Sequence, residues 1–205
     1  MIIHAVGNRC AVNLDSLNVS LSRLEVLSLL EREGFRVLEV DMMALARSHI
    51  GRAAYRRCAF MREAPQVVDC ASLIKWMYAH AGIWLPRDLL LWVDLGTPVD
   101  LADIAQGDLI FTNGYSNRRV ERVGDVGHVG IATDSGTVIH ATNRIGIEEI
   151  PVDSFLARRT FCCARRVIAE QAGLVTLSIP PHQEIEISQD IEWMLFDVIR
   201  STKKD

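Results

Sequence analysis

The chain of 205 residues is long enough for one domain of ordinary size with small additions. Its composition, 49% hydrophobic and 23% charged with a formal net charge of -4, is that of a soluble globular protein and argues against nucleic acid as a partner. No apolar run approaches the roughly 18 residues of a transmembrane segment. The first residues lack the pattern of a cleaved signal peptide, so we expect a cytoplasmic location or export by a signal-independent route.

The number of cysteines is odd and their spacing is irregular: they are Cys10, Cys58, Cys70, Cys162 and Cys163. Two adjacent cysteines such as Cys162 and Cys163 do not readily bond to each other. We therefore expect a reducing compartment, while one pair in an oxidising compartment stays compatible with the count.

Within the first 50 residues, residues 22–33 and 42–49 have helical periodicity. Residues 35–40 between them are a strand candidate. Ser22 and Glu25 have the spacing of a capping box, and Asp41 is placed to cap the second helix. We assign residues 1–44 to an N-terminal addition.

Residues 69–82 predict a helix that Asp69 caps and Gly82 ends. Its inward stripe consists of Cys70, Leu73, Ile74, Met77 and Ala81. Cys70 lies in the first turn, where free amides and the helix dipole are expected to lower the pKa of a thiol. On this feature alone, a buried structural cysteine is the more common interpretation.

Strand candidates bounded by turn residues follow this helix, over residues 108–112, 128–133, 137–141 and 159–168. Because helices come first and strands afterwards, the pattern predicts an α+β fold with an antiparallel sheet. The expected domain covers residues 45–168. Residues 169–205 form a C-terminal extension to which we assign no chemistry.

Two histidines fall on one predicted hairpin. If Thr133 and Thr137 close the loop between its strands, His140 lies opposite Gly130 and diagonal to His128 on the same face. Diagonal neighbours are about 7–8 Å apart, within reach for one imidazole to orient another. A shift of the register by one residue would place the two histidines on opposite faces.

Cys70, His128 and His140 can supply the nucleophile, the base and the orienting group of a cysteine hydrolase. A zinc site built from the same residues is the competing interpretation, but no closely spaced pair of ligands accompanies them. We therefore expect catalysis without a metal or another cofactor.

Motifs typical of one peptidase family occur in the family's order, as Val68-Asp-Cys-Ala-Ser-Leu73, Ala81-Gly-Ile-Trp-Leu-Pro-Arg87, Gly107-Asp-Leu-Ile-Phe111, Gly127-His-Val-Gly-Ile131 and Val138-Ile-His-Ala141. Residues 44–168 thus resemble the NlpC family of papain-like cell-wall cysteine peptidases. The resemblance implies a papain-like core whose nucleophile helix packs on an antiparallel β-sheet. It also implies Cys70 as nucleophile, His128 as base and His140 as the third residue, with the amide of Cys70 in the oxyanion hole.

The substrate or oxyanion region is expected to include Tyr55, Asp69, Ser72 and Arg87. Tyr55 resembles a family tyrosine that donates near the oxyanion, and Asp69 is primarily a helix cap. Arg87 either faces an acidic substrate or forms a surface ion pair with Asp88.

The chain departs from the family pattern in two places. Ala71 and Ser72 stand where Ser and Gly are usual, and Arg56-Arg57 stands where a Gly pair usually follows the tyrosine. Both changes lie at the substrate cleft, so they affect the prediction of substrate more than that of catalysis.

We expect an endopeptidase or amidase that acts through a thioester intermediate. The resemblance implies peptide or peptidoglycan fragments as substrate, especially the bond from γ-D-glutamate to a diamino acid. Two alternatives stay open: a cytosolic amidase or acyl transferase with a non-cell-wall substrate, and a catalytically inactive binding module on the same scaffold. The sequence leaves the oligomeric state undefined.

Overall fold

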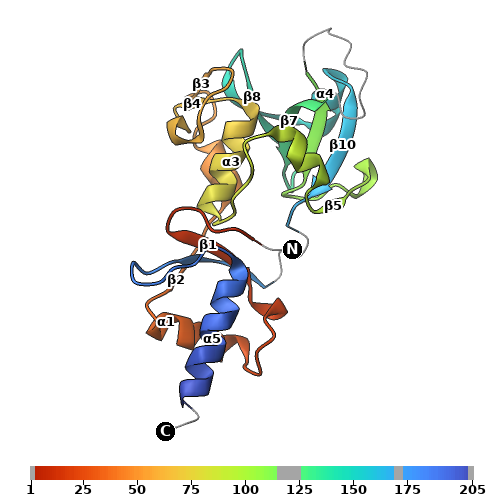
Figure 1. Cartoon of the computed structure of the whole chain (residues 1–205). Helices are drawn as coiled ribbons and strands as arrows, with labels where there is room; N and C mark the ends of the chain where they lie inside the picture. Colours follow the sequence, from red (N-terminus) through yellow and green to blue (C-terminus); the bar gives the residue numbers. More distant parts are fainter. Residues whose placement is uncertain (1–2, 115–125, 169–172, 203–205) are drawn as a thin grey trace. The chain divides into compact units, whose positions relative to one another are not determined.

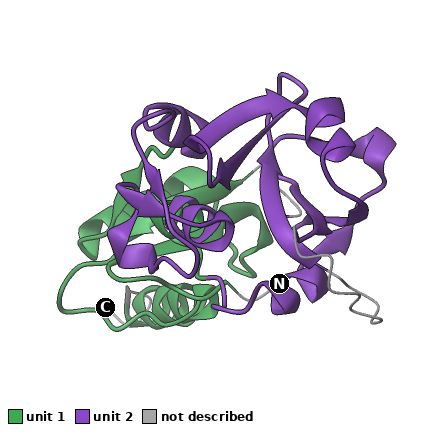
Figure 2. Cartoon of the chain, turned by 90° about the horizontal axis from the view of Figure 1, so that it is seen from above, with its two compact units in different colours: residues 1–40, 78–84, 170–205 green, residues 41–77, 85–169 purple. Residues whose placement is uncertain are grey.

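The computed structural model describes residues 3–114, 126–168 and 173–202 (Figure 1). The chain forms two compact units (Figure 2). The terminal unit comprises Met1–Val40, Tyr78–Trp84 and Glu170–Asp205, and the central unit comprises Asp41–Met77 and Leu85–Ala169. Each unit has its own β-sheet.

The terminal unit joins both ends of the chain in one antiparallel sheet of order β1-β11-β2. Its elements are β1 Arg9–Asn13, η1 Leu14–Ser16, α1 Arg23–Arg32, β2 Arg36–Leu38, β11 Leu174–Ser178 and α5 Ser188–Thr202. Its core consists of buried apolar side chains from these elements, including Val12, Leu30, Phe35, Leu177 and Leu195. Burial of this apolar surface is what holds such short strands together.

The predicted capping box is confirmed at the start of α1. The backbone amide of Ser22 donates to Glu25 Oε2 at 2.8 Å, and the amide of Glu25 donates to Ser22 Oγ at 3.4 Å. The buried side of α1 carries Val26, Leu29 and Leu30.

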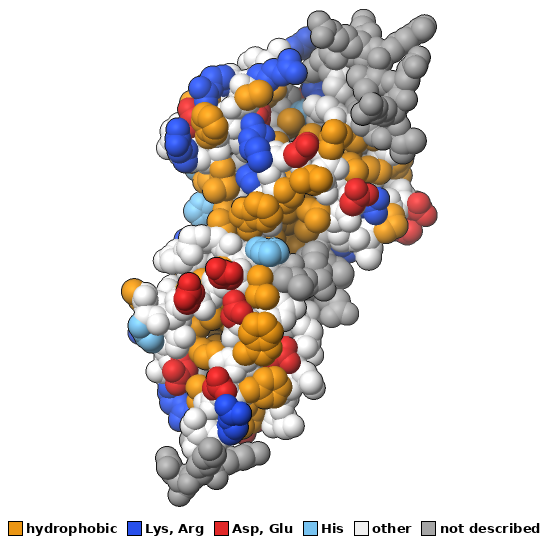
Figure 3. Space-filling model, in the orientation of Figure 1, with side chains coloured by type: hydrophobic (Ala, Val, Ile, Leu, Met, Phe, Trp, Pro, Cys, Tyr) orange, Lys and Arg blue, Asp and Glu red, His pale blue; other side chains and the backbone are white. Residues whose placement is uncertain are grey.

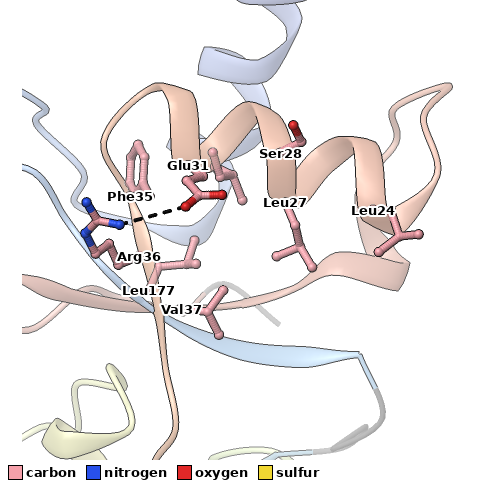
Figure 4. Close-up of a pocket in the computed structure, with 9 residues that line it drawn as sticks. Leu24, Leu27, Ser28, Glu31, Phe35, Arg36, Val37 and Leu177 are labelled. Atoms are coloured by element: carbon pink, nitrogen blue, oxygen red, sulfur yellow. Dashed lines mark ion pairs between the residues drawn. The ribbon is translucent and has the colours of Figure 1, made fainter.

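A groove of about 460 Å³ runs between α1 and β2 of the terminal unit (Figure 4). Leu24, Leu27 and Val37 line it, and Arg36 forms an ion pair of 3.9 Å with Glu31 beside it. Leu24 is 79% exposed, so this groove is apolar and open to solvent.

The central unit holds a six-stranded antiparallel sheet of order β5-β10-β6-β7-β8-β9 and a separate parallel pair of β3 with β4. Its strands are β3 Ala54–Tyr55, β4 Val67–Val68, β5 Thr97–Pro98, β6 Leu109–Asn113, β7 Val126–Ala132, β8 Thr137–Thr142, β9 Gly146–Pro151 and β10 Phe161–Arg166. Its helices are α2 Met42–Arg47, η2 Met61–Glu63, α3 Cys70–His80, η3 Leu89–Asp94, η4 Leu101–Asp103 and α4 Val152–Ala157, and the last residues of α3 belong to the terminal unit.

The α+β prediction is confirmed: α3 packs on an antiparallel sheet, and the four strands predicted after it are present as β6, β7, β8 and β10. Strand β9 and helix α4 were not predicted. Phe155 of α4 packs against Ile110, Ala132 and Val138 on one face of the sheet.

An ion pair between the partly exposed Arg166 and the buried Asp108 joins β10 to the start of β6. Arg166 donates to both carboxylate oxygens of Asp108, at 2.9 and 2.8 Å, and Asp108 Oδ2 also accepts from the amide of Ala105 at 2.8 Å. Asp108 is fully buried, so its charge depends on these donors.

All five cysteines are free thiols. Within the described ranges, the chain has no helix of the length and apolar character that a membrane span requires.

Candidate active site

The first turn of α3 is fixed by reciprocal hydrogen bonds between Asp69 and Ser72. The amide of Ser72 donates to Asp69 Oδ1 at 2.6 Å, and the amide of Asp69 donates to Ser72 Oγ at 2.8 Å. Both side chains are buried. The predicted cap by Asp69 is thus confirmed, and the hydroxyl of Ser72 is occupied by the same cap.

Cys70 is the first residue of α3, and its sulfur lies against β7. The backbone amides of Val129 and Ala71 are close enough to Sγ to lower the pKa of this thiol. Because Val129 directly follows His128, the thiol lies at the part of β7 that carries this histidine.

The expected lowering of the Cys70 pKa was wrong. Burial, followed by the negative charge of Asp69, raises the pKa of Cys70 to about 11. The amides of Val129 and Ala71 lower this pKa, but their effect is smaller. Removing a thiolate from water outweighs the favourable helix position here. At neutral pH the resting nucleophile is therefore a thiol.

The β7–β8 hairpin has the predicted register. Ile131 pairs with Ile139 and Ala132 with Val138, and the Thr133–Thr137 backbone hydrogen bond of 2.9 Å closes the loop. Gly136 supplies the left-handed residue of this loop, with φ of 71°.

His128 and His140 meet on one face of this hairpin. His128 Nε2 lies 2.9 Å from His140 Nδ1, and the rings are nearly perpendicular, with an interplanar angle of 82°. Both side chains are buried, and the ring of Phe155 lies against both. Burial, followed by the charge of Arg159, lowers the pKa of each histidine, so both imidazoles are neutral.

Glu148 was missed by the sequence reasoning and lies directly behind His140. The two residues pair across β8 and β9, and His140 Nε2 is 3.2 Å from Glu148 Oε1. This distance is that of an ion pair, while the angle does not form a hydrogen bond. Arg158 Nη1 donates to the same oxygen at 2.7 Å.

A signal for Glu148 was present in the sequence. Thr142 pairs with Gly146 across a second tight turn, and Gly146 has φ of 82°. Two residues away from the turn on each strand, residue 140 lies opposite residue 148. This is the same argument that gave the register of the first hairpin.

Tyr55 lies on β3 and pairs with Val68 of β4, directly before the cap of α3. Burial, then the proximity of Cys70 and Asp69, raises the pKa of Tyr55. A tyrosine is protonated at neutral pH even at its ordinary pKa of about 10, so the phenol of Tyr55 is available as a donor near the sulfur.

Arg87 pairs with Asp69 and not with Asp88, so the expected Arg87–Asp88 pair was wrong. Arg87 Nη2 lies 3.7 Å from Asp69 Oδ2, whereas Asp88 Oδ1 accepts from the amide of Leu90 at 2.9 Å. Asp88 is held as the cap of η3, which directs its carboxylate away from its neighbour.

Basic side chains gather on the central unit over the part that holds β3 and β4 (Figure 3). The exposed arginines of this segment are Arg52, Arg56, Arg57 and Arg62. Arg56 and Arg57 follow Tyr55 directly in the chain, and Arg56 forms an ion pair with Glu63. Among the described residues, no group of three His, Cys, Asp or Glu side chains is arranged to hold a metal ion.

The model of the NlpC/P60 family matches residues 57–166. A probable endopeptidase of Corynebacterium glutamicum is 36% identical over 80 residues, which are 38% of this chain and 33% of that protein. The peptidoglycan DL-endopeptidase CwlO of Bacillus licheniformis is 31% identical over 81 residues, 38% of this chain and 16% of that protein. The probable endopeptidase NlpC of Escherichia coli is 28% identical over 101 residues, 49% of this chain and 62% of that protein.

The solved structures of NlpC2 and NlpC1 from Trichomonas vaginalis each align with a TM-score of 0.52 at 23% identity. They cover 62% of this chain, and 44% and 42% of their own chains. At this identity the similarity shows a shared fold. The chain spans about a third of the Corynebacterium relative, 33% of its length.

Proposed function

The chain belongs to the NlpC/P60 family, and on that basis we propose that its central unit is a cysteine peptidase that hydrolyses amide bonds in peptidoglycan stem peptides. The observation that carries this proposal is the thiol of Cys70, held against β7 next to the buried His128–His140 pair. The substrate class is supported by the curated relative whose name is peptidoglycan DL-endopeptidase.

In the acylation step, His128 takes the proton of Cys70 as Sγ attacks the carbonyl carbon of the substrate amide. The tetrahedral intermediate collapses to a thioester, the C–N bond breaks, and the imidazolium of His128 gives its proton to the leaving amine. Because the resting thiol and imidazole are both neutral, proton transfer accompanies the attack.

In the deacylation step, a water molecule takes the place of the amine. His128 removes a proton from it, and the resulting hydroxide attacks the thioester carbon. Collapse of the second intermediate releases the carboxylic acid and returns the proton to Cys70. No metal or other cofactor takes part in this scheme.

Two donors are assigned to the developing oxyanion. The amide of Cys70 is at the N-terminus of α3, where amides lack partners within the helix. The hydroxyl of Tyr55, which lies near Cys70, is the second donor.

The exposed arginines of the segment that carries Tyr55 favour a substrate that carries carboxylates. Stem peptides have this character, although the whole chain has a formal net charge of -4. We assign Arg57 and Arg87 to this electrostatic attraction, and we assign cleavage to the bond between γ-D-glutamate and the diamino acid.

The test is mass spectrometry of defined muropeptides after incubation with the wild-type chain, Cys70→Ala and Cys58→Ala. Cys58 is an exposed free thiol of the same unit and serves as the matched control. We expect cleavage by the wild type and Cys58→Ala and none by Cys70→Ala, with the fragment masses giving the bond. If a folded wild-type chain cleaves no stem peptide, the substrate assignment is wrong.

A further inference from the structure

The His128–His140 contact continues through two more side chains. His140 Nδ1 faces His128 Nε2 at 2.9 Å, and its Nε2 faces Glu148 Oε1 at 3.2 Å. Arg158 Nη1 donates to the same Glu148 oxygen at 2.7 Å. Glu148 is 9% exposed, so its carboxylate acts on His140 with little screening by water.

The carboxylate determines which nitrogen of His140 carries the proton. A neutral imidazole has one N–H and one lone pair, and a lone pair facing a carboxylate is repelled. The proton of His140 is therefore on Nε2, where a rotation of the Glu148 carboxylate about its soft terminal torsion completes a hydrogen bond.

The tautomer of His140 in turn determines that of His128. With its proton on Nε2, His140 presents a lone pair at Nδ1 and accepts from Nε2–H of His128. A neutral His128 whose proton is on Nε2 has its lone pair on Nδ1. This is the atom left free to accept the proton of Cys70.

We propose that Glu148 is a positioning residue that sets the tautomers of His140 and His128, so that His128 presents an unprotonated Nδ1 to the nucleophile. This inference rests on the proposed function and adds a fourth residue to its Cys-His-His set. Without the carboxylate, His140 can carry its proton on Nδ1 and donate to His128. His128 then holds its proton on Nδ1 and cannot act as the base.

Arg158 holds the carboxylate in place rather than touching the histidines. Its side chain is 45% exposed and bonds the oxygen that faces His140. The charged groups that lower the pKa values of the histidine pair are Arg159, which acts on both rings, and Arg158, which acts on His140, while His140 itself lowers the pKa of His128. We expect a smaller effect from Arg158→Gln than from loss of Glu148.

The direct test reads the imidazole protons by ¹⁵N–¹H correlation NMR of the full chain labelled at its six histidines, without substrate. In the wild type we expect the Nε2–H tautomer for both His128 and His140. In Glu148→Gln and Glu148→Ala, the signals of His140 should shift towards the Nδ1–H tautomer. Retention of the wild-type tautomers in Glu148→Ala would overturn the proposal.

The matched control is Glu149→Gln. Glu149 is the next residue on β9, and its carboxylate bonds Arg47 at 2.9 and 2.8 Å instead of approaching the histidines. Its substitution removes the same charge from the same strand, and both tautomers should stay as in the wild type. An equal shift in Glu149→Gln would show that the effect is structural and contradict the proposal.

The kinetic test compares kcat/KM on the muropeptide that the wild type cleaves. We expect Glu148→Gln to lower it by between about 10-fold and 10⁴-fold, the upper figure being the loss that a wrong histidine tautomer causes in a serine protease. KM should change little, because Glu148 is not assigned to the substrate. Thermal unfolding of each variant checks that the fold is intact.

The two proposals fail in different ways. If no stem peptide is cleaved but the tautomers respond to Glu148, the substrate is wrong and the positioning role stands. If muropeptides are cleaved equally well by Glu148→Gln and the tautomers do not change, the positioning role is wrong and the peptidase assignment stands.

Discussion

His128 Nε2 lies 2.9 Å from His140 Nδ1, although 12 positions separate the residues in the chain. The contact follows from the hairpin register, because pairing of Ile131 with Ile139 places both histidines on one face. The two histidines that we propose as base and orienting group are thus joined through a local turn, whereas the proposed nucleophile, Cys70, comes from a separate helix.

His140→Ala should impair catalysis without removing the nucleophile. Loss of the orienting ring frees His128 to adopt the wrong tautomer or rotamer, and we expect kcat/KM on muropeptides to fall by about 10²- to 10³-fold. Thr142→Val is the control, because Thr142 is buried two residues away on β8 and its hydroxyl has no hydrogen-bond partner among the described residues. Wild-type activity in His140→Ala would exclude the assigned role.

Gly130→Ala should damage the site through His140. A Cβ at Gly130 would lie 2.3 Å from Val138 Cγ1 and 3.3 Å from His140 Cβ, so the Val138 side chain or the strand β8 that carries both residues must shift. We expect muropeptide cleavage at least about 10-fold slower, because displacements near 1 Å in a catalytic group have large effects. Gly136→Ala, in open space at φ of 71°, should lose about 1 kcal/mol of stability and keep its activity.

Local sequence signals predicted much of the site. The Asp69 cap and the glycine of the β7–β8 loop are short-range features, so the start of α3 and the register of the hairpin follow from neighbouring residues. The resemblance named Tyr55, which the structure places near Cys70.

Features that depend on distant packing were not predictable in this way. The partner of β1 is β11 from the opposite end of the chain, and no local pattern encodes that pairing. Glu148 and Glu149 interrupt the apolar alternation of β9, so the sequence pattern did not predict this strand. The pKa of Cys70 was wrong in sign because burial by other elements outweighs the helix position.

Acid should destabilise the fold through the buried imidazoles. Burial lowers the pKa of His128 from 6.5, so below that pH the unfolded chain binds a proton that the folded chain does not, and stability falls as the pH falls. Urea unfolding between pH 6.5 and pH 5 measures this slope, and His128→Gln should reduce it by about 0.7 kcal/mol per pH unit at pH 6.5, rising to about 1.4 kcal/mol per pH unit near pH 5. A slope in His128→Gln equal to that of the wild type would contradict this origin of the acid sensitivity.

Arg166→Ala should be among the most destabilising substitutions of a charged residue in the central unit. It leaves the fully buried carboxylate of Asp108 with one amide donor, and because the Arg166 side chain is itself 34% exposed, we expect a cost of about 1–3 kcal/mol. Arg56→Ala removes the pair with Glu63, whose side chains are 53% and 30% exposed, and should cost less than about 1 kcal/mol. Equal losses in urea unfolding would contradict this difference.

Tyr55→Phe tests whether the phenol acts on the transition state or only packs. The variant keeps the ring on β3 and removes the donor, so the fold and KM should change little. If the hydroxyl bonds the oxyanion, kcat falls by up to about 10²- to 10³-fold, because a donor that bonds the transition state more strongly than the substrate affects kcat. A rise in KM at constant kcat would instead place Tyr55 in substrate binding, and unchanged kinetics would leave it a packing residue.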